Sequence, residues 1–193
     1  MCMMLKPRCN RRSGWGKSLL WGGKKKKKKH THTHSVLLVV FFDWKGIIHH
    51  EFVPGGQMVN KQLYQEVLAR LGDVVRRKRP EFWENQTWTL HHDNDPAHAS
   101  LLICSYVAKH QTSVVPHPPN SPDLAQAEFF LFLKHKNTLK GRRFQTIEDI
   151  QENAKRELRA ITESAFQEAF QQWKNRWERC VASKGDYVEE DSV

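Results

Sequence analysis

The chain has 193 residues, 39% of them hydrophobic, and a formal net charge of +10 at pH 7. This length predicts one domain that is large enough to bury a core. The four cysteines have no paired spacing, which excludes a disulfide-stapled module and a cysteine-based zinc site and fits a reducing intracellular compartment. No apolar run is long enough to cross a bilayer, so we expect no membrane association.

The positive charge is concentrated at the start of the chain. Residues 1–34 contain eleven of the 31 lysines and arginines and no acidic residue, so the remainder, with 20 basic and 21 acidic residues, is nearly neutral. Because like charges repel, we expect residues 1–35 to form a disordered basic tail. Its lysine block can be interpreted as a nuclear import signal, as a phosphate-binding arm or as a solvated segment without a role; its members are Lys24, Lys25, Lys26, Lys27, Lys28 and Lys29.

Two β-rich runs follow the tail, at residues 36–42 and 47–53. The short segment 43–46 joins them and ends in glycine, which predicts a β-hairpin with Asp43 as a turn residue.

The next segment predicts a helix that Asn60 can cap. The basic cluster at residues 76–79 suits the C-terminal end of this helix, although the same cations could contact a DNA backbone. The pattern then predicts a strand, a helix opened by proline and a second short strand, over residues 87–92, 96–110 and 112–115.

A stiff loop with four prolines occupies residues 116–122 and precedes a predicted helix over residues 125–137. A basic turn with Arg142 and Arg143 ends that helix. The spacing predicts two further helices, one opened by a capping box at Thr146 and the other beginning at Ser164. The last helix carries an aromatic stripe, which favours core packing over base stacking; its members are Phe166, Phe170, Trp173 and Trp177.

Strands that alternate with helices predict an α/β sheet covered by helices. We therefore expect a folded domain over residues 36–188, preceded by the basic tail and followed by an acidic end over residues 189–193.

Two acids stand beside the proline-rich loop in the sequence. Asp93 follows a β-rich run, and Glu128 begins the apolar segment after the prolines. Carboxylates delivered to one end of a sheet could hold Mg²⁺ or Mn²⁺, and two such ions can activate water for phosphodiester cleavage. Alternatively, Asp93 caps the following helix and Glu128 is a solvated acid at a helix start. Spacing alone leaves both interpretations open.

Several motifs resemble the catalytic domain of mariner-type transposases, in order, from about residue 36 to residue 186. The resemblance is carried by His91-His92-Asp93-Asn94, Pro116-His117-Pro118-Pro119, Ser121-Pro122-Asp123-Leu124-Ala125, Phe129-Phe130-Leu131-Phe132, Lys140-Gly141-Arg142-Arg143-Phe144 and Gly185-Asp186-Tyr187. It implies a ribonuclease-H-like fold in which three acids surround two Mg²⁺ or Mn²⁺ ions. Asp93 matches the second acid and Glu128 the third, where the family normally has aspartate.

The first acid of the family pattern has no counterpart in this sequence. In the family it lies on a strand before the hairpin, and Asp43 matches the turn after the second strand instead. We therefore expect a ribonuclease-H-like α/β sheet that lacks its first central strand, for which residues 17–21 are a short possible substitute. The paired helix-turn-helix units of the family have no counterpart either, which predicts a truncated domain.

Three functional interpretations follow. The first is a catalytically inactive, transposon-derived remnant that binds DNA non-specifically through the lysine block, Arg142 and Arg143. The second is a Mg²⁺- or Mn²⁺-dependent nuclease or transposase that uses Asp93 and Glu128. The third is a translated relic without a function. The resemblance also implies a homodimer, and the basic tail favours a nuclear protein over a cytoplasmic one.

Overall fold

The structure is a computed structural model that describes residues 2–5, 8–10, 35–54, 57–134, 144 and 146–184. Its strands form one mixed sheet in the order β2-β3-β1-β5-β6, and β4 also pairs with β3, off this path. The strands are β1 (Cys2–Leu5), β2 (Arg8–Asn10), β3 (Ser35–Asp43), β4 (Gly46–Val53), β5 (Thr89–His91) and β6 (Ser113–Val115).

The predicted hairpin is confirmed as the antiparallel pair β3 and β4. Gly46 closes its turn with a φ of +132°, a conformation that side chains rarely permit. Successive β3 residues are buried on opposite faces of the sheet: Phe41 packs into one core cluster and Phe42 into the other. A strand that is covered on both faces has a continuous apolar sequence, as this segment does.

The sheet has a central strand, contrary to the expectation from the sequence. β1 pairs antiparallel with β3 and parallel with β5, and β2 pairs with β3. Residues 2–5 and 8–10, which the sequence predicts as part of a disordered tail, therefore complete the sheet. A four-residue apolar segment is too short to show a strand period, and its partner β5 lies far along the sequence, so the pattern gave no sign of it. The proposed substitute, residues 17–21, lies outside the described residues.

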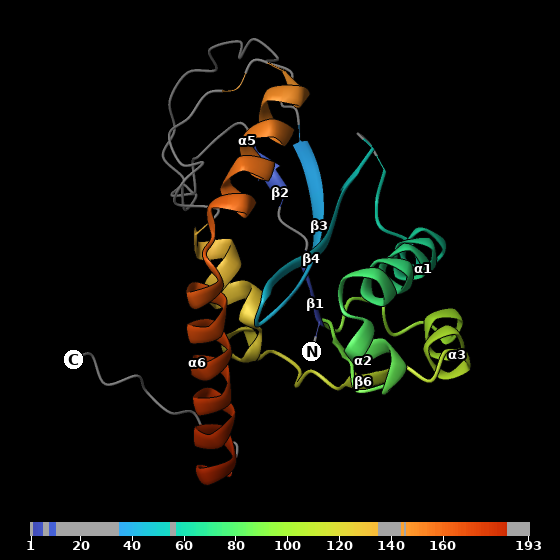
Figure 1. Cartoon of the computed structure of the whole chain (residues 1–193), viewed down its shortest axis with the longest axis vertical. Helices are drawn as coiled ribbons and strands as arrows, with labels where there is room; N and C mark the ends of the chain where they lie inside the picture. Colours follow the sequence, from blue (N-terminus) through green and yellow to red (C-terminus); the bar gives the residue numbers. More distant parts are fainter. Residues whose placement is uncertain are drawn as a thin grey trace, which may run out of the picture.

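Helices cover both faces of the sheet (Figure 1). One face packs against α1, whose buried side chains include Tyr64 and Leu71, and against Ile103 of α3. The other face packs against η2, α5 and α6 through residues such as Leu131, Leu158 and Phe166. The helices are α1 (Lys61–Lys78), α2 (Pro80–Glu84), α3 (Leu101–Lys109), η1 (Pro122–Leu124), η2 (Ala127–Phe132), α5 (Ile147–Ala160) and α6 (Glu163–Ala182).

The predicted caps of two helices are confirmed. The Asn60 side chain accepts a hydrogen bond from the backbone of Leu63, and Thr146 forms a reciprocal capping box with Asp149. Such caps satisfy backbone N–H groups that have no partner within the helix. α6 differs from its prediction because it begins at Glu163 after Thr162, not at Ser164.

Two other predicted helices differ from their predictions. α3 begins at Leu101, because the residues after Pro96 form turns in which the Asp95 carbonyl accepts from the backbone of His98 at 2.8 Å. The segment after the prolines forms η2, a π-helix over Ala127–Phe132, which α-helical spacing does not predict.

The first two members of the aromatic stripe of α6, Phe166 and Phe170, pack in the core as predicted. Phe166 is buried, and Phe170 packs against the same core cluster, with its ring 6.2 Å from that of Phe42. Of the helices in the described ranges, none combines the length and the apolar character that a bilayer crossing requires.

Candidate functional site

Asp93 lies two residues beyond the end of β5, in a turn at the edge of the sheet. Its side chain is 58% exposed, and its Oδ1 lies 2.6 Å from Nδ1 of His98. The backbone N–H of Asp95 donates to the same oxygen at 3.3 Å. The carboxylate is therefore oriented by the turn on one side and open to solvent on the other.

The alternative role of Asp93 as a helix cap is not what the structure shows. α3 begins at Leu101, and its N-cap residue is Ser100. Asp93 instead accepts a hydrogen bond from the residue two positions along, which is the geometry of a local Asx turn.

Glu128 is the second residue of η2, and its side chain is exposed. Its backbone N–H donates to the Ala125 carbonyl at 2.8 Å. A solvent-exposed acid in the first turn of a helix fits the alternative interpretation as well as a metal-binding one, so the position alone does not separate the two.

A chain of contacts connects both acid-bearing segments to α6. Trp173 of α6 donates from Nε1 to the Leu124 carbonyl at 2.7 Å, just before η2. The ring of Trp173 also lies 5.5 Å from the ring of His91, at the end of β5. His91 Nε2 in turn lies 3.2 Å from Nδ1 of His117, and the Asn94 amide donates to the His117 carbonyl. The proline-rich loop is thereby fixed beside the turn that carries Asp93.

The central strand brings no carboxylate to this edge. β1 runs parallel to β5, and the last pair of residues in their register is Met3 and His91, two residues before Asp93. The sequence of β1 contains no acid, and residues 1–34 contain none either. Among the described residues, no group of three histidine, cysteine or acidic side chains could hold a metal ion. Asp93 and Glu128 each offer hard carboxylate oxygens of the kind that Mg²⁺ prefers, and two acids are fewer than a two-ion centre requires.

The histidines around Asp93 are held in the neutral form. Burial lowers the pKa of His91 from 6.5 to about 4, with a further contribution from His117. Burial also lowers the pKa of His92 to about 4, and the Tyr64 hydroxyl oxygen lies 2.9 Å from Nδ1 of that ring. The pKa of His117 is lowered mainly by burial, although the nearby Asp93 carboxylate opposes the shift. The surroundings of Asp93 are thus polar but carry no positive charge from these three rings near neutral pH.

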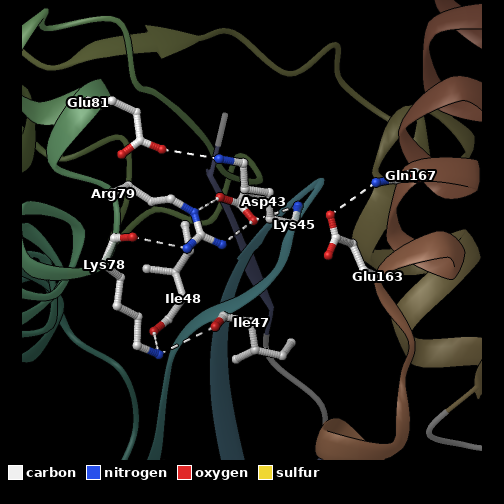
Figure 2. A network of polar contacts seen from close by, with 9 residues as sticks. All are labelled: Asp43, Lys45, Ile47, Ile48, Lys78, Arg79, Glu81, Glu163 and Gln167. Carbon is white, nitrogen blue, oxygen red and sulfur yellow. Dashed lines mark hydrogen bonds and ion pairs between the residues drawn. The ribbon is translucent and has the colours of Figure 1, made fainter.

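The basic cluster at the end of α1 stabilises the fold (Figure 2). Arg79 makes two hydrogen bonds to Asp43, from Nε at 2.7 Å and from Nη2 at 3.2 Å. Lys78 donates to the Ile48 carbonyl at 2.8 Å, and the backbone N–H of Lys45 donates to Asp43. The predicted turn role of Asp43 is confirmed, and these contacts favour a structural role for the cluster over DNA contact. The other predicted DNA-binding residues, from Lys24 to Lys29 with Arg142 and Arg143, lie outside the described residues.

Sequence reasoning missed the residues that hold Asp93 in place. Neither His98 nor Tyr64 stands in a pattern that indicates a role at the site. A spacing of five residues between Asp93 and His98 gives no periodic signal, since the contact depends on a turn.

Comparisons with known proteins agree with the geometry. A family model described as "Transposase (partial DDE domain)" matches residues 11–85. The Mariner Mos1 transposase of Drosophila mauritiana is 32% identical over 156 residues, which cover 80% of this chain and 45% of that protein. The chain therefore spans less than half the length of this curated relative.

Two solved structures are similar over 97% of this chain. The catalytic domain of Mos1 mariner transposase is 26% identical, with a TM-score of 0.76 and 84% of that chain covered. The Mos1 mariner paired end complex with Mn is also 26% identical, with a TM-score of 0.83 and 56% of that chain covered. These similarities confirm the predicted ribonuclease-H-like α/β fold.

Proposed function

We propose that this chain, which contains part of the catalytic domain of the mariner-type transposase family, binds DNA and one divalent cation but does not cleave DNA strands. The observation that carries the proposal is the register of the central strand. It pairs Met3 with His91, two residues before Asp93, in a strand whose sequence contains no acid. Phosphodiester cleavage by two metal ions requires ligands that hold both ions. With two acids and no third ligand cluster among the described residues, the site falls short of that requirement.

The cation in this proposal is Mg²⁺ or Mn²⁺, held by Asp93 and Glu128. Both side chains offer hard carboxylate oxygens, and both are open to solvent. The similar Mos1 complex contains Mn, which supports the choice of cation. When bound, such an ion would offset the negative charge of a DNA phosphate.

The DNA-binding part of the proposal rests on charge. Eleven lysines and arginines without an acid in residues 1–34 would release counterions from a phosphate backbone. We include Arg142 and Arg143 as secondary contacts, a nuclear location and a homodimer. The paired end complex of the relative supports the homodimer.

The first experiment measures nicking of supercoiled plasmid with Mg²⁺ or Mn²⁺. We expect the wild-type protein and Asp93→Asn to nick equally slowly, because neither holds two ions. Leu5→Asp tests the cause: a third acid, on the central strand, should tighten Mn²⁺ binding about tenfold, while the matched Leu5→Asn should not. Equal Mn²⁺ affinity in the two Leu5 variants would contradict the register argument.

DNA affinity is tested separately by its salt dependence. Replacing all six lysines of residues 24–29 with glutamine should reduce the slope of log K against log salt by up to about five. Replacing Arg77 and Arg76 with glutamine is the control, because Arg76 is already paired with Asp73 in the folded protein. An unchanged slope of log K against log salt in the lysine variant would contradict DNA binding by the lysine block.

The runner-up is an active metal nuclease that uses Asp93 and Glu128. The exposed, pre-oriented carboxylate of Asp93 favours it. Mn²⁺-dependent nicking by the wild-type protein, abolished in Asp93→Asn with the fold retained, would establish this activity in place of the inactive form.

A further inference from the structure

His98 returns to Asp93 through a tight turn. Its backbone N–H donates to the Asp95 carbonyl at 2.8 Å, which brings the ring back over the start of the turn. Nδ1 then lies 2.6 Å from Oδ1 of Asp93 and 3.4 Å from the Asp93 carbonyl oxygen. The shorter of the two distances is that of a strong hydrogen bond to a carboxylate.

The His98 ring is held rigidly in this position. Only 2% of its side chain is exposed. It stacks on the His92 ring at a centroid distance of 5.1 Å and an interplanar angle of 15°, and it lies 4.1 Å from the Tyr64 ring. The Tyr64 hydroxyl contacts Nδ1 of His92, so the two rings that hold His98 also hold each other.

The surroundings of Nε2 indicate which ring nitrogen of His98 carries the proton. Nε2 is buried and has no hydrogen-bond partner among the described residues. A proton on Nε2 would be a buried donor without an acceptor, which is costly, whereas a bare lone pair there costs less. The proton therefore belongs on Nδ1, from which it donates to Asp93.

We propose that His98 is a positioning residue, which fixes the Asp93 carboxylate by donating from Nδ1 to Oδ1 and presents its exposed side to a divalent cation. This inference rests on the cation binding in the proposed function. A ligand carboxylate is usually oriented by a second group in this way, and removal of that group typically weakens metal affinity by about 10- to 100-fold.

The test uses three substitutions of His98 and Mn²⁺ titration followed by electron paramagnetic resonance of the free ion. His98→Asn places an amide donor near the position of Nδ1, His98→Gln places it near Nε2, and His98→Leu has no donor. All three lose the ring stacking, so packing alone cannot separate them.

We expect Mn²⁺ affinity to fall about tenfold or more in His98→Leu and His98→Gln and to stay within about threefold of wild type in His98→Asn. Equal losses in the Asn and Leu variants would overturn the positioning role. Wild-type protein that binds Mn²⁺ no better than Asp93→Asn would overturn the proposed cation site, and the role of His98 toward a cation with it.

A second measurement does not need the metal. Long-range ¹H–¹⁵N correlation spectra of the wild-type protein report which ring nitrogen of His98 carries the proton. We expect the Nδ1–H tautomer in the wild type and its loss in Asp93→Ala. An Nε2–H tautomer in the wild type would overturn the proposal even if Mn²⁺ binds, which separates its failure from that of the cation site.

Discussion

Two aspartates, one at the end of β3 and one two residues beyond β5, have opposite surroundings. Asp43, at the turn of the hairpin, is 2% exposed and accepts hydrogen bonds from the Lys45 backbone and from two nitrogens of Arg79. Asp93, beyond β5, is 58% exposed and is held on one oxygen by His98. The first acid is fully used by the fold, whereas more than half of the second side chain is exposed.

The surroundings of the two acids extend this contrast. Five buried side-chain atoms lack a hydrogen-bond partner in the part of the chain that the structure describes. Four of them lie in the segments that lead to Asp93 and Glu128: Nδ1 of His91, Nε2 of His98 and both amide atoms of Gln126. None belongs to the network around Asp43. Unpaired buried polar groups cost stability and are concentrated where a chain serves a function rather than its fold.

The largest expected effect is acid destabilisation through the Asp93 region. The folded-state pKa of His91 and His92 is about 4, against 6.5 for the free ring. Between these values the unfolded chain binds more protons than the folded one, so the free energy of unfolding falls as the pH falls from 6.5 to 4. The combined loss is on the order of 5 kcal/mol, measured by urea denaturation at successive pH values.

His91→Leu is the control for this pH dependence. It removes one of the two rings, so the slope between pH 6.5 and 4 should fall by about half. Carboxylates with a lowered pKa, such as Glu51, lose their contribution to the free energy of unfolding only as the pH falls below about 4.5. They therefore cannot produce a slope that begins near pH 6.5. A profile that is flat above pH 5 would show that these rings are not held neutral by burial.

The second prediction concerns the contribution of Asp43 to stability. Asp43→Ala leaves the Arg79 guanidinium, whose pKa is raised by its hydrogen bond to Asp43, without its partner in a mostly buried site. We expect a loss of about 3 kcal/mol in the free energy of unfolding. The matched control is Asp73→Ala, which removes an exposed aspartate paired with Arg76 and should cost less than about 1 kcal/mol. Similar losses in both variants would contradict the structural role of Asp43.

The sequence predicts the locally determined features of the molecule, including the hairpin with Asp43, better than the surroundings of Asp93. The hairpin, the Asn60 cap and the Thr146 capping box depend on neighbours within a few residues, and their patterns are local. β1 escaped prediction because four apolar residues have no recognisable period, and because its parallel pairing with β5 depends on residues more than 80 positions away.

The candidate site could be predicted only in part for the same reason. Asp93 and Glu128 were identified by resemblance, and the assignment of metal binding to them stays a prediction. The lack of an acid on the central strand can be located only from the pairing of β1 with β5. The contact between His98 and Asp93 needs a turn, and the contacts of His98 with Tyr64 and His92 need the packing of α1.

The smallest expected effect concerns the segment that carries Glu128. Gln126 is completely buried immediately before η2, and neither atom of its amide has a partner among the described residues. Gln126→Leu has a similar volume and removes the unpaired amide, so we expect the free energy of unfolding to rise by about 1 to 2 kcal/mol. Gln167→Leu on the exposed face of α6 is the control and should change stability by less than about 0.5 kcal/mol. A destabilised Gln126→Leu would mean that this amide has a partner in solution, such as a buried water, and that the Glu128 segment is as fully paired as the network around Asp43.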